Sequence, residues 1–351
     1  MSETLLLKAN LFRDGHDMPT VSVKKSGTGF LLEYGDVRFA LDTGIKGETT
    51  LLSHSHSDHI GGLQKAGHII ATRGTLDTWK ARRSNRFRNT SEIKHGDMFG
   101  QIGANITALN AGHVLGSTMF HIEFNDGLTV LYTGDFNNVD SLVHKAAKPV
   151  EADVLITEAT YGSPNWIFPN RKTVYQKILD TVTEIIDNGR IPLFHAYSLG
   201  KSQEAIALLQ SGGFRVISGN SSIDKVCKVY KHHGVDLKHL SLRSSETTNA
   251  LEEGAVIVSS SSRHTISSMR KIFGDNRLTK LESKIEYFDL SGWTIGKFRR
   301  QGFPLSAHSD FNGLLSFAKS VKPRIAYCFT ENGRILSKHL SENGVHSVPL
   351  E

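Results

Sequence analysis

The sequence has few cysteines and no long apolar run, and each scarcity argues against a class of protein. Cys227 and Cys328 are its two cysteines, and neither stands in a spacing typical of paired metal ligands. We therefore expect two reduced, buried thiols rather than a disulfide scaffold. No apolar stretch approaches the roughly 18 residues that a membrane span needs, and the first residues lack the layout of a signal peptide. These absences predict a cytoplasmic protein with no membrane association.

Low-complexity tracts are absent as well. With 38% hydrophobic and 22% charged residues and no proline-rich segment, the composition is that of an ordinary globular protein. A chain of 351 residues forms one large domain or two moderate ones. Either arrangement can bury an active site, and neither indicates an oligomeric state.

Basic residues are in excess, with a net charge of +6 and an isoelectric point of about 9.1. The excess favours polyanionic partners, although many basic proteins bind no nucleic acid. Two local clusters are more specific. In residues 78–89 (TWKARRSNRFRN), Trp79 and Phe87 are interleaved with the cations Lys80, Arg82, Arg83, Arg86 and Arg88. Residues 296–303 (GKFRRQGF) hold Lys297, Arg299 and Arg300. Cations neutralise phosphates and aromatic rings stack on unpaired bases, which favours a track for nucleic acid. A solvated helix face is the alternative.

The chain changes its rhythm near residue 170. Before that point short β-rich runs dominate, such as VRFALDT, HIIAT and LTVLYTGD. After it helices and buried strands alternate, as in TVYQKILDTVTEIIDNG followed by IPLFHAY. This βα alternation predicts a parallel sheet with its functional loops at the carboxyl ends of the strands. We interpret the pattern as one domain interrupted by a second.

The stretch LLSHSHSDHIGG carries His54, His56, Asp58 and His59 within six positions, directly after a predicted strand. Side chains alternate faces along a strand, so these four lie on a loop folded around a common centre. Imidazoles and carboxylates without thiols suit Zn²⁺, with Mn²⁺ and Fe²⁺ as alternatives. The sequence therefore predicts a metal site at this loop.

Two further candidates follow predicted strands downstream. His113 occurs in NAGHVLGS and Asp135 in LYTGDFNN, each with glycine beside it. Glycine lets the backbone approach an ion closely. The order His-x-His-x-Asp-His, then Gly-His, then Gly-Asp resembles the metallo-β-lactamase superfamily. That resemblance implies an αββα sandwich and a site for two Zn²⁺ ions, with Mn²⁺ as the alternative.

The resemblance also implies a role for each ligand. His54, His56 and His113 are expected to hold the first ion, and Asp58 and His59 the second. Asp135 is expected to bridge the two, and Asp42 in FALDTG to orient the ligands by hydrogen bonds. Two ions about 4 Å apart can share a hydroxide and stabilise charge on a phosphoryl oxygen. Hydrolysis by a metal-bound hydroxide is the expected reaction.

The second half of the chain resembles the β-CASP nucleases of that superfamily, which act on DNA or RNA phosphodiesters. The segments ITEATYGSPNWIFP, AYSLGKSQ, LSGW and FPLSAHSD carry this resemblance. They are most similar to short exonuclease-like members, described as ligase-associated DNA exonucleases or archaeal mRNA 3′-end processing factors. The resemblance implies an inserted α/β domain. We expect residues 1–165 and 298–351 to form the metallo-β-lactamase domain and residues 166–297 the β-CASP insertion.

Glu158 and His308 are implied to lie together beside the metals, with Asp58, Glu158 and His308 as the catalytic residues. A carboxylate that holds an imidazole favours its protonated form, which can donate to a leaving alkoxide. Contact with the scissile phosphate is the alternative role for His308. The family's last motif is a histidine in RNA-acting members and often a valine in DNA-acting ones. Here the segment reads RIAYCFTENG, and the motif position falls on Phe329, Thr330 or Glu331. The second metal site is therefore under-coordinated, takes Glu331 or is absent; the lost histidine favours DNA, whereas the naming of the archaeal subgroup favours RNA.

Substrate contacts are expected from both halves of the chain. Backbone N–H groups and Lys201 in SLGKSQ can hold a phosphate, and so can the serine-rich run after a later strand. The full set of substrate-binding candidates is Lys201, Ser259, Ser260, Ser261, Arg263, Arg82 and Arg83. A Gly-Lys-Ser turn at a helix start is common, so a purely structural role is the alternative.

The leading hypothesis is a metal-dependent exonuclease that acts on single-stranded DNA, RNA or both, in DNA repair or RNA processing. One alternative keeps the metallo-hydrolase chemistry and assigns it to a small ester or thioester. The other is an inactive β-CASP subunit that binds nucleic acid without cleaving it.

Overall fold

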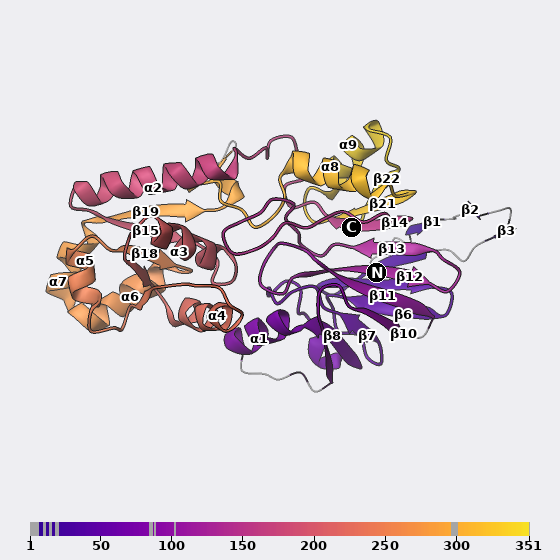
Figure 1. The fold of residues 1–351 in the computed structure, drawn as a ribbon, viewed down its shortest axis with the longest axis horizontal. Coiled ribbons are helices and arrows are strands. Elements are labelled where there is room, and N and C mark those ends of the chain that lie inside the picture. The colour runs from indigo at the N-terminus through magenta and orange to yellow at the C-terminus, as the bar shows by residue number, and fades with distance from the viewer. Residues whose placement is uncertain are drawn as a thin grey trace, which may run out of the picture. The chain divides into compact units, whose positions relative to one another are not determined.

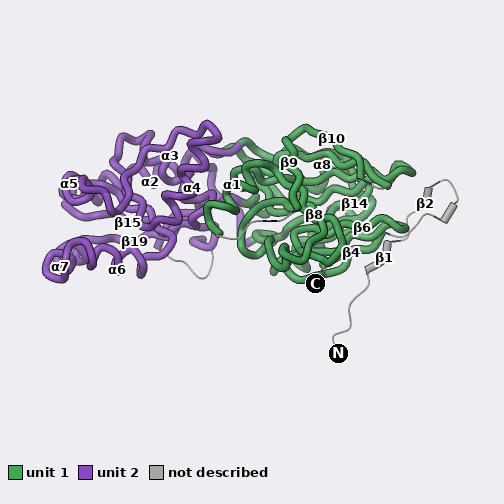
Figure 2. The backbone as a smooth tube through the Cα atoms, turned by 90° about the horizontal axis from the view of Figure 1, so that it is seen from below, with its two compact units in different colours: residues 1–140, 145–164, 308–351 green, residues 141–144, 165–307 purple. Residues whose placement is uncertain are grey.

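A computed structural model represents the chain (Figure 1). It describes residues 7–9, 12–13, 16–17, 21–83, 87, 89–101, 103–295 and 301–350. The described chain divides into two compact units (Figure 2). Unit 1 comprises residues 1–140, 145–164 and 308–351, and unit 2 comprises residues 141–144 and 165–307. The domain boundaries at 165/166 and 297/298 stay a prediction.

The first sheet of unit 1 has seven strands in the order β1-β4-β5-β6-β7-β8-β9. Its strands are β1 (Leu7–Ala9), β4 (Val21–Ser26), β5 (Gly29–Tyr34), β6 (Val37–Leu41), β7 (Thr49–Leu51), β8 (His68–Thr72) and β9 (Thr90–Ile93). Neighbours are antiparallel up to β6 and parallel from β6 to β9. A separate two-stranded ribbon pairs β2 (Phe12–Arg13) with β3 (His16–Asp17).

The second sheet of unit 1 also has seven strands, in the order β10-β11-β12-β13-β14-β21-β22. They are β10 (Met98–Gln101), β11 (Ala104–Asn110), β12 (Thr118–Phe124), β13 (Thr129–Tyr132), β14 (Val154–Glu158), β21 (Ile325–Phe329) and β22 (Ser347–Pro349). The pairs from β13 to β22 are parallel, as crossover connections require. The strand β21 returns to this sheet after unit 2.

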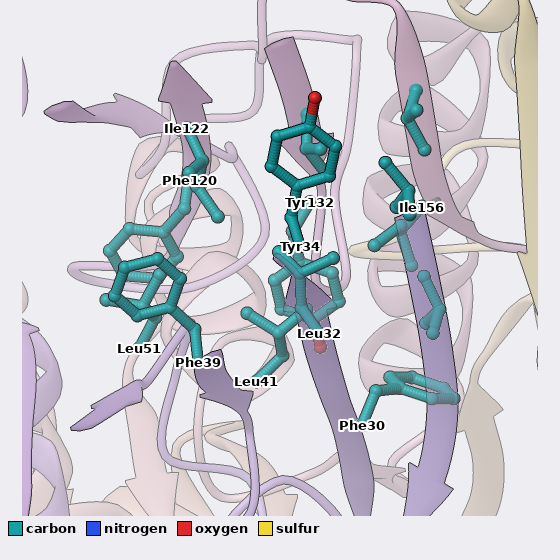
Figure 3. Close-up of a cluster of buried hydrophobic side chains, with 14 of the residues drawn as sticks. Phe30, Leu32, Tyr34, Phe39, Leu41, Leu51, Phe120, Ile122, Tyr132 and Ile156 are labelled. Atoms are coloured by element: carbon teal, nitrogen blue, oxygen red, sulfur yellow. The ribbon is translucent and has the colours of Figure 1, made fainter. Parts of the chain in front are cut away.

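The main core fills the space between the two sheets (Figure 3). Phe30, Leu32 and Phe39 come from the first sheet, and Phe120 and Ile122 come from the second. This follows from the two-residue period of a strand, which turns alternate side chains of β12 toward the same face. Burying each such side chain stabilises the fold by roughly 1.5–3 kcal/mol.

Helices cover the outer faces of both sheets. The helices α8 (Phe311–Val321) and α9 (Gly333–Glu342) pack on the second sheet, where Met119 and Leu131 belong to the shared core. The helix α1 (Arg73–Arg82) and the 3₁₀ turn η1 (Leu63–Lys65) cover the first sheet. The predicted αββα sandwich is confirmed.

Unit 2 is built on a parallel six-stranded sheet in the order β17-β16-β18-β15-β19-β20. Its strands are β15 (Ile191–His195), β16 (Val216–Ser218), β17 (Leu240–Ser241), β18 (Val256–Ser259), β19 (Ile285–Leu290) and β20 (Gly302–Phe303). Its helices are α2 (Arg171–Asp187), α3 (Lys201–Ser211), α4 (Ser221–His232), α5 (Thr247–Glu252), α6 (Ser262–Phe273) and α7 (Asp275–Glu282), with a 3₁₀ turn η2 (Gly292–Thr294). The predicted parallel sheet is confirmed.

The two faces of this sheet carry different helices. The helices α5, α6 and α7 share a hydrophobic core with Leu193 and Ile257 on one face. The helices α2, α3 and α4 pack against β15, β16 and β18, where Phe194 and Val258 point the opposite way and are also buried. Both faces are therefore covered, as is usual for a parallel sheet.

Cys227 and Cys328 are free and buried, as predicted. None of the helices in the described ranges combines the length and the apolar character that a membrane crossing requires.

Candidate metal centre

The candidate site lies in unit 1, in loops that follow strand ends of both sheets. Because β6 and β7 are parallel in one sheet, and β11, β13 and β14 run in the same direction in the other, their loops gather at shared edges. These loops and strand ends carry Asp42, His54, His56, Asp58, His59, His113, Asp135 and Glu158. His308 precedes α8.

Two backbone features allow this convergence. Asp42 adopts a φ of 51°, in the left-handed region that non-glycine residues seldom enter, and such residues concentrate at functional sites. Gly134, with a φ of 52°, precedes Asp135. A Cβ at Gly134 would lie 2.6 Å from Oγ of Ser53, so only glycine lets the two loops approach this closely.

Three imidazole nitrogens form the first group. His56 Nδ1 lies 3.0 Å from Nε2 of His54 and 3.0 Å from Nε2 of His113. Ligands held about 2.0–2.1 Å from one ion, at angles from 90° to tetrahedral, lie roughly 2.9–3.4 Å apart. The ring nitrogens therefore have the spacing of ligands around one cation. Together with Asp135 they form a set of four potential ligands within 4.8 Å.

The orientation of His54 follows from its neighbours. Ser53 Oγ donates to Oδ2 of Asp42 at 2.5 Å, so this hydroxyl accepts from Nδ1–H of His54 at 2.9 Å. The assignment places the lone pair of His54 on Nε2, which faces His56. The hydrogen-bond network thus presents the nitrogen that a metal requires.

Asp135 stands between two groups of ligands. Its Oδ2 lies 3.6 Å from Nε2 of both His54 and His113, and 3.3 Å from Nε2 of His59. The carboxylate is buried. This is the position that a bridging ligand would occupy, and the bridging role stays a prediction.

Asp42 is a buried acceptor for four donors. Its Oδ1 accepts from the Ser53 N–H at 2.6 Å. Its Oδ2 accepts from the Ser53 hydroxyl, from the Tyr132 hydroxyl at 2.7 Å and from His59 Nδ1 at 2.7 Å. The bond to Nδ1 directs Nε2 of His59 toward Asp135. Asp42 also belongs to a group of potential ligands with His54 and His59, in addition to its orienting contacts.

Asp58 is set apart from these groups. Its side chain is 77% exposed, and its Oδ2 lies 4.0 Å from His59 Nε2. Two ligands of one ion reach a separation of about 4 Å only when they lie on nearly opposite sides of it. Among the described residues, the three clusters of potential ligands do not include Asp58, and its role stays a prediction.

Glu158 and His308 come together although 150 positions separate them. His308 Nδ1 lies 2.9 Å and 3.0 Å from the two carboxylate oxygens of Glu158, which also accepts the Phe136 N–H at 2.8 Å. The His308 ring stands 4.5 Å from the His113 ring, centroid to centroid. Both side chains group with Asp135 as potential ligands. The pair therefore borders the imidazole cluster.

Burial and neighbouring charges set the protonation of this site. Burial lowers the pKa of His54 well below its ordinary value and that of His56 to about 4, so both are neutral at pH 7, as metal ligands must be. Burial also disfavours the charged form of His59, but Asp135 and Asp42 outweigh it and raise its pKa well above the ordinary value. Burial acts to raise the pKa of Asp135, yet His59 and His308 hold it well below the usual range.

The end of β21 supplies no further ligand among the described residues. Phe329 is buried in the core and packs 5.1 Å from the Phe30 ring. Thr330 has a φ of 76° and accepts the Ala159 N–H with its hydroxyl at 3.1 Å. Glu331 is exposed. This end of the sheet therefore braces the Glu158 loop through the Thr330 hydroxyl, and a ligand role for Glu331 stays a prediction.

The basic cluster of residues 78–89 is only partly described. Arg82 donates to the Ser55 carbonyl within the histidine loop, and Lys80 and Arg83 are exposed. Trp79 is buried and stacks 4.4 Å from Phe87 in the α1 core, so its interpretation as a base-stacking ring is wrong. Arg86 and Arg88, and the cations Lys297, Arg299 and Arg300, lie outside the described residues.

The substrate-binding candidates of unit 2 differ in accessibility. Ser259 is buried and its hydroxyl bonds Thr265 at 2.7 Å. Ser261 caps α6 by accepting the His264 N–H. Ser260 lines a cavity of about 460 Å³. Arg263 is exposed, whereas Lys201 is buried at the start of α3.

Sequence reasoning missed two residues that position the site. The Ser53 hydroxyl donates to Asp42 and accepts from His54, so it connects the two side chains. The Tyr132 hydroxyl also donates to Asp42. Tyr132 had a detectable signal, because a tyrosine inside an apolar strand needs a buried acceptor for its hydroxyl. Ser53 offered none, since serine is common beside histidine loops of any kind.

Comparisons with known proteins agree with this geometry. A family model described as a beta-lactamase superfamily domain matches residues 35–209. A protein of Opitutus terrae named probable DNA ligase is 27% identical over 295 residues, which cover 81% of this chain and 27% of that protein. An RNase J-like protein of Methanocaldococcus jannaschii is 34% identical over 184 residues, 47% of this chain and 44% of that one.

A third relative is the RNase aCSPSF2 of Saccharolobus solfataricus, which is 30% identical over 195 residues, 47% of this chain and 38% of that protein. This chain thus spans less than half the length of each of these three relatives. The αββα sandwich, the inserted parallel sheet and the histidine and carboxylate clusters agree with the relatives and the family match. These matches make the chain similar to the metallo-β-lactamase superfamily and support its resemblance to the β-CASP nucleases within it.

Proposed function

We propose that the protein is a metal-dependent nuclease that hydrolyses phosphodiester bonds of single-stranded DNA or RNA from an end. The observation that carries the proposal is the convergence of three imidazole nitrogens and Asp135 beside the Glu158–His308 pair. A donor set of nitrogen and oxygen without sulfur favours Zn²⁺, with Mn²⁺ as the alternative. Bound ions would activate water and neutralise charge on the phosphoryl oxygens.

The chain's own residues hold and orient the reacting groups. Asp42 and Ser53 keep Nε2 of His54 and His59 directed into the site through bonds to their Nδ1 atoms. His54, His56 and His113 would hold one ion, His59 and Asp58 would hold a second, and Asp135 would bridge the two. The separations between the ligand atoms support these assignments, and that of Asp58 follows the family pattern.

His308 is the proposed proton donor. Glu158 accepts from Nδ1 of His308, which leaves Nε2 as the atom that exchanges a proton with the substrate. A buried carboxylate beside the ring favours its protonated form, so Nε2–H can donate to the leaving alkoxide. Contact of this N–H with the scissile phosphate is the second candidate role.

Cations near the histidine loop are proposed to hold the substrate backbone. Arg82 lies against the Ser55 carbonyl, and Arg83 is exposed next to it. Each neutralised phosphate contributes to a salt-dependent affinity. Arg263 and Ser260 of unit 2 are proposed as further phosphate contacts.

The names of the relatives support both nucleic acids. Two of them are named ribonucleases, and the third is named a DNA ligase. We therefore propose an exonuclease of DNA repair or RNA processing and do not choose between DNA and RNA as its substrate. The choice is a matter for direct measurement.

The test is a side-by-side digestion of end-labelled single-stranded DNA and RNA with Zn²⁺ or Mn²⁺. Stepwise shortening of either strand is expected from the wild type and not from His56→Ala. A wild type that cleaves neither strand but turns over a thioester would assign the fold to small-ester hydrolysis. Equal strand binding by both proteins without cleavage would identify an inactive binding subunit, and cleavage by His56→Ala at the wild-type rate would refute the metal mechanism.

A further inference from the structure

Lys201 of unit 2 is a buried cation with an unusual environment. The residue is 6% exposed and begins α3. Its Nζ lies 4.2 Å from the centroid of the Tyr197 ring, which is the contact that the described residues provide to it. A lysine buried to this degree ordinarily has a carboxylate partner.

The two carboxylates whose charges act on Lys201 are hydrogen-bonded to other residues. Glu204 accepts from Arg171 at 2.8 and 2.9 Å and from the Tyr175 hydroxyl. Asp289 accepts from His195 Nδ1 at 2.9 Å. Both act on Lys201 only through longer-range attraction, and burial lowers the pKa of Lys201 to about 8. An anion at this ammonium would relieve the cost of burying it.

The start of α3 adds to the positive potential at this point. Gly200 occupies the N-cap position with a φ of 91°, and it has no side chain to cap the first N–H groups, of which that of Ser202 donates to the Tyr197 carbonyl at 3.2 Å. The helix has 11 residues, long enough for its N-terminus to favour an anion. The helix end and the buried ammonium of Lys201 are two independent features that point to the same kind of ligand.

Tyr197 supplies a second type of contact. The residue is 60% exposed although its ring lies against the Lys201 ammonium. An exposed aromatic ring provides a stacking surface for a nucleic-acid base of any sequence. Tyr197, which can stack on a base, therefore lies four positions before Lys201, which can bind a phosphate.

The topology of the sheet explains why a site forms at this point. The neighbouring parallel strands β15 and β18 lead into α3 and α6, which pack on opposite faces. Ligands of open α/β sheets bind in the crevice at such a switch in direction. A cavity of about 460 Å³ lies at this edge, lined by His195, Ser260 and Asp289 among others.

We propose that Lys201 and Tyr197 form a subsite for one nucleotide of the substrate strand, with its phosphate on Nζ and the α3 N-terminus and its base on the Tyr197 ring. The proposal rests on the nuclease function and names the part of its substrate that unit 2 reads. The ligand is a nucleotide within a single strand, recognised without preference for base.

The test measures binding of a fluorescein-labelled oligo(dT) of about 15 nucleotides to the full chain, with a chelator present to prevent cleavage. Lys201→Met is expected to weaken the affinity roughly tenfold and to lower the log–log salt slope by about 0.7. Tyr197→Leu is expected to weaken it roughly tenfold, and Tyr197→Phe to stay within about twofold because the ring remains. Lys177→Met, on the exposed side of α2, controls for the loss of one positive charge.

A strand with abasic sites separates the two contacts. It is expected to retain the Lys201→Met effect and to lose the Tyr197→Leu effect. Thermal melting checks the fold, and Lys201→Met should melt no lower than the wild type because it removes a buried charge. If the wild type cleaves the strand while Lys201→Met and Tyr197→Leu both bind it with wild-type affinity, the subsite is refuted and the nuclease function is not. A wild type that neither binds nor cleaves oligonucleotides would overturn the subsite together with the proposed function.

Discussion

His308 Nδ1 lies 2.9 Å from Oε2 of Glu158, and the Glu158 side chain is completely buried. The first residue precedes α8 and the second ends β14, so the longer segment of unit 2, residues 165–307, lies between them in the chain. A buried carboxylate that accepts from Nδ1 fixes which nitrogen of the ring reaches a substrate. The pairing suits a proton-transfer unit, and the first prediction concerns it.

Glu158→Gln and His308→Ala are expected to lower kcat by about 10²–10⁴-fold with little change in KM, because the lost step is proton transfer. The double variant should be no slower than the worse single variant, since the two act as a unit. Steady-state kinetics on a labelled oligonucleotide measure these effects, and metal analysis verifies that the ions are retained. A rise in KM with unchanged kcat would contradict the donor role.

Tyr132→Phe is expected to lower the free energy of unfolding by about 1–2 kcal/mol, because buried Asp42 loses one of its four donors. Urea unfolding with a chelator present isolates this effect from metal binding. Tyr327→Phe is the matched control, since its buried hydroxyl has no partner among the described residues. That control is expected to be neutral or stabilising, and equal losses in both variants would contradict a specific role for the Tyr132 hydroxyl.

His144 is expected to make the protein sensitive to acid. Burial lowers its pKa to about 4, and its Nε2 is hydrogen-bonded to the Tyr230 hydroxyl at 2.8 Å. Between pH 6.5 and about 4 the unfolded state binds the proton more readily than the folded state. The contribution of neutral His144 to the free energy of unfolding is therefore fully present above this window and is lost as the pH falls through it. The loss reaches up to about 3 kcal/mol.

Denaturant unfolding at pH 7 and at pH 4.5 measures the effect of His144. His144→Gln should show a smaller difference between the two pH values than the wild type, and exposed His346→Gln should match the wild type. An unchanged pH difference in His144→Gln would show that other groups carry the acid sensitivity.

Metal binding is expected to stabilise the folded chain. Adding Zn²⁺ at about 100 times its dissociation constant should raise the free energy of unfolding of the metal-free protein by roughly 2.7 kcal/mol. His56→Ala should abolish most of this gain, because His56 Nδ1 lies 3.0 Å from both neighbouring ligand nitrogens. His68→Ala, at the start of β8, is the control. Equal stabilisation of both variants would place the ion elsewhere.

Much of the fold follows from local patterns in the sequence. The alternation in β12 turns Phe120 and Ile122 toward one face and Met119 toward the other. The sequence therefore predicts both the strand and its burial on two faces. The close spacing of His54, His56 and His59 after β7 indicates a loop around a metal in the same way. These are properties of neighbouring residues, which a sequence displays directly.

Other properties depend on partners distant in the chain or on burial. The cations around Trp79 suggested an exposed ring, but the stack with Phe87 and the core under α1 bury it. Ser259 has the residue type of a phosphate contact, yet its hydroxyl bonds Thr265 inside the fold. Lys201 is predicted from its place in a glycine turn, whereas its burial without a carboxylate partner among the described residues is visible only in three dimensions.

The short segment 141–144 belongs to unit 2 although residues 140 and 145, on either side of it, belong to unit 1. It brings His144 to the Tyr230 ring of α4, only nine positions after Asp135. A fragment of residues 165–307 would therefore lack a piece of its own interior and expose the Tyr230 hydroxyl. The insertion is discontinuous, and whoever excises it for study must supply two stretches of chain rather than one.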